Sequence, residues 1–212
     1  TLSSSSAASD VYKRQGYNHL IVGLISDTHI PESRDVLWPQ VYEAFSKVDC
    51  ILHAGDIYDI GVIEKLSEIA PTYAARGNGD EGSGGRDPQP EHPSVKESWL
   101  IELNGFKVGV THYIPMPPIP PKLTPQNWIK KLFPQVTPDV VIYGDTHVEQ
   151  IDHFGGILCV NPGSPTLPHN LNTQLGTIGM LDLSGAAPTA SIHQLTAEGI
   201  EPFKWEGSRR PW

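Results

Sequence analysis

The tripeptide Asp-Thr-His occurs twice in this chain, at residues 27–29 and again at residues 145–147. Each copy comes just after an apolar run that is typical of a β-strand, residues 19–26 in the first case and 138–143 in the second. Carboxylates and imidazoles bind divalent cations and transfer protons. Since the whole chain has only 9 histidines, the repeat indicates that both copies serve one chemical site.

Further residues of ligating type also follow predicted strands. Asp56, Asn78 and His112 each come shortly after an apolar run. The C-terminal ends of strands in an α/β sheet gather at one edge, where ligands bind. A single Asp or His after a strand is more often a helix cap or a turn residue, but so many in one chain indicate a metal site. The candidate ligands are Asp27, His29, Asp56, Asn78, His112, Asp145 and His147.

This set of ligands offers nitrogen and oxygen atoms but no sulfur. The absence of cysteine favours borderline or hard ions and removes the usual sign of a structural zinc site. Seven ligands exceed what one tetrahedral ion needs, so the set predicts two divalent metal ions. Mn²⁺ is our first choice, and Ni²⁺, Zn²⁺, Fe²⁺ and Mg²⁺ are the alternatives.

The elements that position these residues alternate between strand and helix patterns at first and are mostly strands later. Helices are predicted over residues 35–47 and 60–70, and strands over 19–26, 48–54, 71–76, 99–103, 106–111, 138–143, 148–154, 157–161, 175–183 and 189–195. Parallel β-α-β units followed by antiparallel hairpins predict an α/β fold of two packed mixed sheets with helices outside. We expect one domain over 18–200, a disordered or non-native segment over 1–17, and a C-terminal tail over 201–212.

Composition excludes several classes of partner. The formal net charge of −9 argues against a nucleic-acid-binding patch and against an anionic membrane surface. The longest apolar run near the start, residues 20–25, is too short for a membrane span or a signal peptide. Cys50 and Cys159 lie in apolar runs, which predicts buried thiols and a cytoplasmic location. Whether the chain forms a homo-oligomer is left open.

The motifs follow one another in the order D-x-H, G-D, G-N-x-D, T-H and G-D-T-H, and residues 161–164 read N-P-G-S. This order resembles that of the calcineurin-like metallophosphoesterases, and most closely the YfcE-type phosphodiesterases among them. The resemblance covers residues 20–195 and implies a four-layer α/β/β/α sandwich. It implies that the first metal is held by Asp27, His29 and His147, that Asp56 bridges both ions, and that the second is held by Asn78 and His112.

Two positions depart from the family pattern. The family motif G-H-T-H reads G-D-T-H here, so Asp145 stands where a histidine would hold the second metal, and we leave open whether it is a ligand. A carboxylate adds negative charge and favours Mn²⁺ or Mg²⁺. In many relatives the variable position of G-N-x-D is a histidine that can protonate the leaving group. Gly79 cannot do this, although YfcE-type members often lack that histidine as well.

The predicted activity is hydrolysis of a small-molecule phosphate ester, most simply a phosphodiester, by a hydroxide that bridges two metals. Asp56, Asn78 and His112 are the predicted catalytic residues. Asp80 is expected to orient His112 or, alternatively, to cap a turn, and Arg76 either contacts a substrate phosphate or is a solvated side chain. The alternative function is a catalytically weak or inactive relative that serves as a protein-binding scaffold, as the retromer subunit with this fold does.

The loops over residues 81–98 and 113–127 are expected to flank the metals. The second is rich in proline, and its Ile114, Met116 and Ile119 either line a substrate cleft or belong to a segment that binds another protein. His53 lies in an apolar strand and is predicted to be a core histidine.

Overall fold

The strand before the first Asp-Thr-His copy, β1 (Ile21–Ile25), lies inside a seven-stranded sheet of the computed structural model, which describes residues 19–205. On one side of β1 the parallel strands are β2 (Cys50–His53), β3 (Thr72–Ala75) and β4 (Val95–Lys96). On the other side the antiparallel strands are β10 (Thr177–Asp182), β11 (Thr189–Thr196) and β12 (Gly199–Pro202). The sheet is therefore mixed, with its parallel part built from β-α-β units.

The second Asp-Thr-His copy follows a strand of the other sheet, which has five strands. Their order across the sheet is β5 (Ser98–Leu103), β6 (Phe106–Thr111), β7 (Val140–Ile142), β9 (Ile157–Asn161) and β8 (Gln150–Phe154). The three central strands are parallel and the two edge strands are antiparallel to their neighbours. Between β5 and β6, Asn104 and Gly105 both have positive φ angles, of 49° and 86°, as the predicted Asn-Gly hairpin turn requires.

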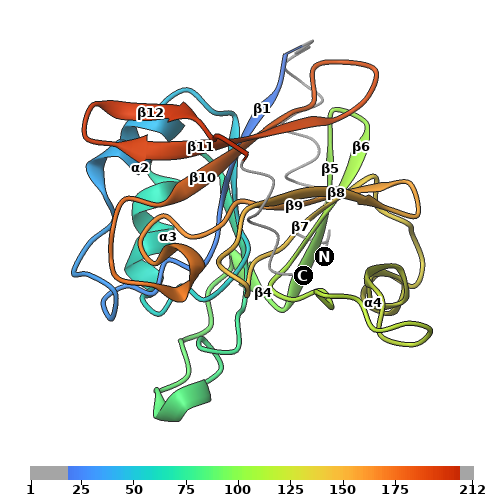
Figure 1. Ribbon diagram of the computed structural model, residues 1–212, viewed down its shortest axis with the longest axis horizontal. Coiled ribbons are helices and arrows are strands. Elements are labelled where there is room, and N and C mark those ends of the chain that lie inside the picture. Colours follow the sequence, from blue (N-terminus) through green and yellow to red (C-terminus); the bar gives the residue numbers. More distant parts are fainter. Residues whose placement is uncertain (1–18, 206–212) are drawn as a thin grey trace.

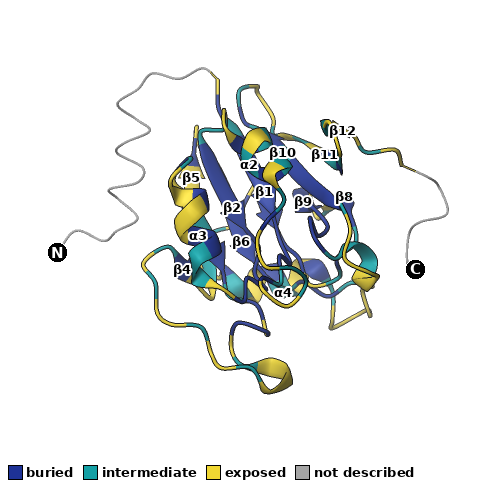
Figure 2. Cartoon of the chain, turned by 90° about the vertical axis from the view of Figure 1, so that its left-hand side faces the viewer, coloured by how far each residue is buried: buried dark blue, intermediate teal, exposed yellow. Residues whose placement is uncertain are grey.

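Helices cover the outer face of each sheet (Figure 1). The helices α2 (Pro39–Phe45) and α3 (Ile60–Ser67) pack on the seven-stranded sheet through a buried cluster that includes Phe45 and Leu66. The helix α4 (Pro125–Leu132) packs on the five-stranded sheet through Ile129. A third apolar cluster fills the space between the sheets, and Figure 2 shows the central strands as buried. The predicted four-layer α/β/β/α sandwich is confirmed.

Most predicted elements are present but shorter than expected. The helix predicted over 35–47 begins only at Pro39, because proline is favoured in the first helical turn and not inside a helix. Two short 3₁₀ turns, η1 (Ser83–Gly85) and η2 (Pro168–Asn170), lie in the connecting loops. The prediction missed α4, although Thr124 caps it by accepting a hydrogen bond from the Asn127 N–H.

The expected start of the C-terminal tail, at residue 201, is wrong. Glu201 and Pro202 belong to β12 and pair with β11, so the domain continues past residue 200. The segment 1–17, which we expected to be disordered or non-native, lies outside the described residues. Among residues 19–205, no helix has the length and apolar character needed to cross a bilayer.

Phe45 closes the contact between α2 and β1. Its side chain is wholly buried, and a Cβ added to Gly23 of β1 would lie 2.8 Å from the Phe45 ring. Phe45→Ala should therefore lower the free energy of unfolding by about 3–5 kcal/mol, because the cavity left in this close packing cannot collapse fully. Chemical denaturation measures this loss. The control Val36→Ala, at a side chain that is 47% exposed, should change it by less than about 0.5 kcal/mol.

Candidate metal centre

The seven predicted ligands meet at the edge formed by the C-terminal ends of β1, β2, β3, β6 and β7. Distances between side-chain atoms link each of them to another member of the set, from 3.2 Å for Asn78 to His112 up to 3.9 Å for His112 to Asp27. The seven-stranded sheet supplies some of these residues and the five-stranded sheet supplies the others. The seven side chains therefore lie close together at this edge, as the sequence predicted.

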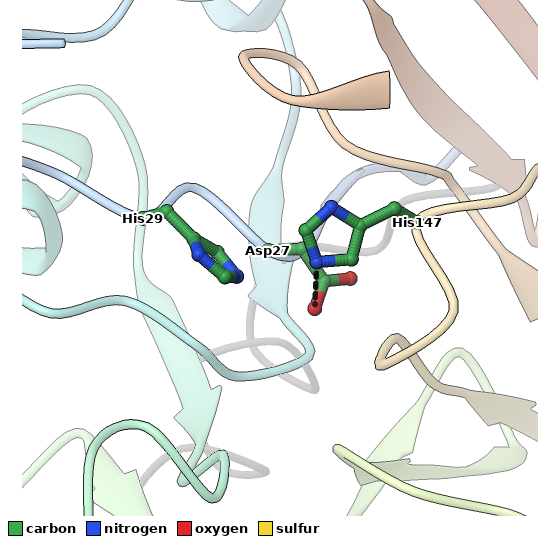
Figure 3. Close-up of side chains that lie close together, drawn as sticks. All are labelled: Asp27, His29 and His147. Atoms are coloured by element: carbon green, nitrogen blue, oxygen red, sulfur yellow. Dashed lines mark ion pairs between the residues drawn. The ribbon is translucent and has the colours of Figure 1, made fainter. Parts of the chain in front are cut away.

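The first group consists of Asp27, His29 and His147 (Figure 3), whose ligand atoms lie within 4.8 Å of one another. His147 Nε2 lies 3.6 Å from Asp27 Oδ1, and the two imidazole rings are 4.7 Å apart between centroids. Asp27 Oδ2 and His29 Nε2 are buried, and neither has a hydrogen-bond partner. Buried polar atoms without partners are costly, and a cation between them would remove that cost.

The second group consists of Asp27, Asp56 and His112. His112 Nε2 lies 3.6 Å from Asp56 Oδ1, 3.7 Å from Asp145 Oδ1 and 3.2 Å from Asn78 Oδ1. The other oxygen of Asp56, Oδ2, lies 3.4 Å from His29 Nε2. The Asp56 carboxylate therefore faces a histidine of each group, which is the position that a bridging ligand requires.

Backbone carbonyl groups fix the orientation of two of the imidazole rings. His112 Nδ1 is 2.7 Å from the Ala54 carbonyl oxygen, and His147 Nδ1 is 2.8 Å from that of Leu167. A carbonyl oxygen can only accept, so each Nδ1 donates its hydrogen, and a neutral ring then carries its lone pair on Nε2. Both Nε2 atoms face the carboxylates, and such orientation by an outer contact is usual for metal-binding histidines.

Burial and charge shift the pKa values of these groups. Burial raises the pKa of Asp27 to about 7, because its carboxylate is wholly shielded from water. Burial also acts on Asp56, but contacts with His29 and His112 outweigh it and lower its pKa to about 2. Burial lowers the pKa of His147. Two buried carboxylates thus lie a few ångströms apart among imidazoles, and divalent cations suit such a set of donors.

The two Asp-Thr-His copies share one local structure. Asp27 and His29 have φ angles of 53° and 48°, and Asp145 and His147 have 70° and 56°. These left-handed values are uncommon outside glycine and occur at functional sites where the surroundings enforce them. The threonine of each copy accepts a hydrogen bond at Oγ1, from His53 Nε2 in the first copy and from Asn161 Nδ2 in the second.

His53 is a core histidine, as predicted. Its side chain is wholly buried, and burial lowers its pKa to about 3. The Gly55 N–H donates to His53 Nδ1, so the neutral ring donates from Nε2 to Thr28 Oγ1, 3.1 Å away. His53 thus supports the loop that carries the first Asp-Thr-His copy.

Asp80 does not orient His112. Its carboxylate accepts hydrogen bonds from the backbone N–H groups of Ile57, Tyr58 and Gly77, at 2.9, 2.9 and 2.8 Å. His112 donates to the Ala54 carbonyl instead. The alternative, in which Asp80 holds a turn, is therefore correct, and Asp80 joins the loops after β2 and β3.

Arg76 is held by the loop that follows β3. Its guanidinium donates to the carbonyl oxygens of Gln89 and Pro90, at 2.9 and 2.8 Å, and lies 3.6 Å from the Glu91 carboxylate. These bonds anchor the guanidinium in the loop and leave some of its five N–H donors free, so a contact with a substrate phosphate stays a prediction.

The turn at residues 161–164 packs beside the ligands. Ser164 Oγ donates to the Asp27 carbonyl oxygen, and Ser26 Oγ donates to the Gly163 carbonyl oxygen, both at 2.7 Å. These bonds join the ends of β1 and β9, which belong to different sheets. The N-P-G-S segment therefore forms a turn beside the candidate ligands, where the sequence predicted it.

Tyr58 is a neighbour of the site that the sequence analysis missed. Its hydroxyl lies 3.4 Å from Asp56 Oδ2, and its ring is 4.3 Å from that of His29 between centroids. The Arg86 guanidinium lies over the same Tyr58 ring, with Cζ 4.3 Å from the ring centroid. A Cβ at Gly79 would lie 2.0 Å from Tyr58 Cε1. The Tyr58 ring therefore fills the space that a side chain at position 79 would need.

The surface beside His112 is hollowed into a cavity of about 510 Å³. Asn78, His112 and Asp145 form one part of its wall, and Tyr113 and Trp128 form another. The expected cleft residues lie elsewhere: Ile114 and Met116 pack in the cluster under α4, and the 62% exposed Ile119 is not part of the wall. The apolar side chains of Ile114 and Met116 therefore serve the core between α4 and the sheet.

Two mixed sheets with helices outside, and a cluster of Asp, His and Asn at one edge, define a metallophosphoesterase-type fold. Residues 20–186 match the model of the calcineurin-like phosphoesterase superfamily domain. The chain belongs to this superfamily, and the resemblance inferred from the sequence is confirmed.

Individual relatives agree with this assignment. A probable metallophosphoesterase of Methanocaldococcus jannaschii is 33% identical over 149 residues, which are 70% of each chain. A phosphodiesterase of the same organism is 28% identical over 180 residues, 76% of this chain and 92% of that one. In fold, vacuolar protein sorting 29 of Cryptosporidium parvum is similar, with a TM-score of 0.67, 23% identity, and coverage of 86% of this chain and 95% of that one.

A side chain at position 79 should disturb the site through Tyr58. Gly79→Ala should lower the free energy of unfolding by about 1–3 kcal/mol, because the new methyl group overlaps the Tyr58 ring. Chemical denaturation measures this effect. Adding Tyr58→Ala should remove most of the extra cost, so that the two changes are not additive.

The matched control is Gly185→Ala, whose Cβ would lie 3.6 Å from the Ala187 carbonyl oxygen, an ordinary contact distance. It should leave the free energy of unfolding within about 0.5 kcal/mol of the wild type. Additive costs of Gly79→Ala and Tyr58→Ala would show that the two residues do not compete for the same space.

Proposed function

We propose that this protein is a divalent-metal-dependent phosphoesterase that hydrolyses a phosphodiester. The observation that carries the proposal is the pair of buried histidines, His112 and His147, each fixed through Nδ1 by a carbonyl group and each facing a buried carboxylate through Nε2. Membership of the phosphoesterase superfamily supports hydrolysis of a phosphate ester. Similarity to the phosphodiesterase of Methanocaldococcus jannaschii supports a phosphodiester as the substrate.

The residues present fit a pair of divalent ions. We assign Asp27, His29 and His147 to the first ion, where two buried ligand atoms have no hydrogen-bond partner. Asn78 and His112 are assigned to the second, with Asp56 between both. Mn²⁺ is the preferred ion because oxygen ligands make up much of the set. When bound, such ions lower the pKa of an attacking water and neutralise charge on the phosphoryl oxygens.

The chain itself orients the carboxylate at the centre of the site. The Gly79 N–H donates to Asp56 Oδ1 at 2.8 Å, and the Tyr58 hydroxyl lies beside Oδ2. Burial raises the pKa of Tyr58 above its usual range, so its hydroxyl stays protonated at neutral pH. Asp56 is thus held by donors and keeps its remaining lone pairs for ligation.

Substrate enters from the side of the second ion. Asn78 and Asp145 are exposed, whereas the other assigned ligands are buried or half-buried. Gly79 brings no acid to this loop, so a leaving group that needs no protonation, such as a phenolate, should be favoured.

A protein-binding scaffold without hydrolysis is the second candidate function. The fold is similar to that of vacuolar protein sorting 29, and Asp145 replaces an imidazole of the family motif. This candidate requires that the second metal is absent or inactive.

We also propose a cytoplasmic location. Cys50 and Cys159 are both buried thiols, as expected where the surroundings keep cysteine reduced.

Asp56→Asn should abolish hydrolysis of an aryl phosphodiester in the presence of Mn²⁺. Changes in residues that only support metal ligands cost about 10- to 100-fold, so losing a bridging carboxylate should cost more than about 100-fold. Removing the metal from the wild type with a chelator should cause the same loss of activity, and adding Mn²⁺ should restore the activity. Asp59→Asn is the matched control, because Asp59 is the exposed cap of α3 and asparagine also caps helices. Near wild-type turnover by Asp56→Asn, with two metals bound, would refute the bridging role.

Asp145 decides between the two candidate functions. If its carboxylate is a ligand, Asp145→Ala should weaken binding of the second metal far more than the first, and Asp145→His should keep activity while shifting preference towards Zn²⁺ or Ni²⁺. Metal titration of the apo forms, counted in bound equivalents, measures both effects. One equivalent in the wild type and two in Asp145→His would identify Asp145 as a lost ligand and favour the scaffold function.

A further inference from the structure

We propose that the cavity of about 510 Å³ beside His112 binds the organic group of the substrate, and that this group is a flat aromatic ring without a second phosphate. The inference rests on the proposed function, because it names the substrate class of the same site. It is carried by the wall of the cavity, which is metal-ligating on one side, aromatic on the other, and rich in carboxylates.

The cavity is continuous with the open side of the metal centre. Asn78, His112 and Asp145 belong both to its wall and to the candidate ligands. A phosphoryl group held there would direct its ester substituent either into bulk water or along the cavity. Burial of an apolar substituent is favourable, so the cavity is the path that binding selects.

The opposite wall is aromatic. The rings of Tyr113 and Trp128 are 5.3 Å apart between centroids, at 89° to one another. This edge-to-face arrangement is a favoured one for aromatic pairs. Both side chains are half-buried, so part of each ring surface remains free to contact a third ring in the cavity.

This aromatic wall is preformed. Tyr113 directly follows the candidate ligand His112, at the end of β6. Trp128 lies on α4, which begins at the Thr124 cap and is anchored in the core by Ile129. Its ring also has Lys131 Nζ 4.6 Å from the centroid. Rings held on ordered elements lose little entropy when they bind a ligand.

The charge of the wall selects against a second anionic group. Glu81, Glu97 and Asp145 contribute three carboxylates to the wall. Arg76 is the basic side chain of the wall, but it donates to two backbone carbonyl groups and lies beside Glu91. A second phosphate would meet repulsion from the carboxylates, whereas a neutral or cationic ring would not.

The test uses ligands that cannot be hydrolysed. With Mn²⁺-loaded wild-type protein, calorimetry should show phenylphosphonate binding about tenfold more tightly than methylphosphonate, since stacking on an aromatic side chain contributes about a factor of ten or more. A nucleoside methylphosphonate forms the second arm and distinguishes a nucleobase from a simple aryl group. Benzene-1,4-bisphosphonate should bind more weakly than phenylphosphonate, because of its second anion.

Trp128→Ala should remove the preference for phenylphosphonate and leave methylphosphonate binding unchanged, whereas Trp128→Phe should retain most of it. The matched control is Trp205→Ala, because Trp205 is 57% exposed and is not part of the cavity wall. Equal binding of both ligands by the wild type, or an unchanged preference in Trp128→Ala, would overturn the inference even if the protein hydrolyses diesters. No turnover and no binding of methylphosphonate to the metal-loaded protein would instead refute the proposed function.

Discussion

A carboxylate buried away from water must be neutralised or hydrogen-bonded, and Asp27 imposes this requirement on the fold. Its side chain is wholly buried, and segments from both sheets surround it. Asp145 donates its backbone N–H to Asp27 Oδ1, Ser164 donates to the Asp27 carbonyl oxygen, and the Asp27 N–H donates to the Gly55 carbonyl oxygen. The other carboxylate oxygen of Asp27, Oδ2, still has no hydrogen-bond partner. One bond therefore holds the Asp27 carboxylate and two hold its backbone, and Oδ2 remains available to a cation.

Because the ligands come from both sheets, the apolar core between the sheets also fixes their separation. Val22 and Leu52 precede the aspartates, Val110 and Ile142 precede the histidines, and all four lie in the same buried cluster. Metal binding would therefore link the two halves of the sandwich. A ligand that binds only the folded state stabilises it by about 2.7 kcal/mol at 100 times its dissociation constant. The core and the site are thus thermodynamically coupled.

The sequence was most informative where chemistry and strand ends coincide. An Asp, Asn or His after an apolar run predicted the seven candidate ligands that meet at the centre, because parallel strands bring their C-terminal ends together, but it did not predict Tyr58 beside them. The roles of Asp80 and of Ile114 could not be predicted in this way. Asp80 accepts hydrogen bonds from backbone N–H groups of two loops. Ile114 packs under α4, a helix that was not predicted because the sequence before it is rich in proline. Such roles depend on neighbours that are distant in the sequence.

The contact between Gly79 and Tyr58 also constrains how this loop can change over evolutionary time. The two positions are far enough apart to mutate separately, yet the space for one side chain excludes the other. A side chain at position 79 should therefore cost less stability where position 58 holds a small residue. Positions 58 and 79 should therefore covary among homologous sequences, with aromatic residues at position 58 where position 79 is glycine. The order in which the two positions change would then decide how much stability the intermediate variant loses.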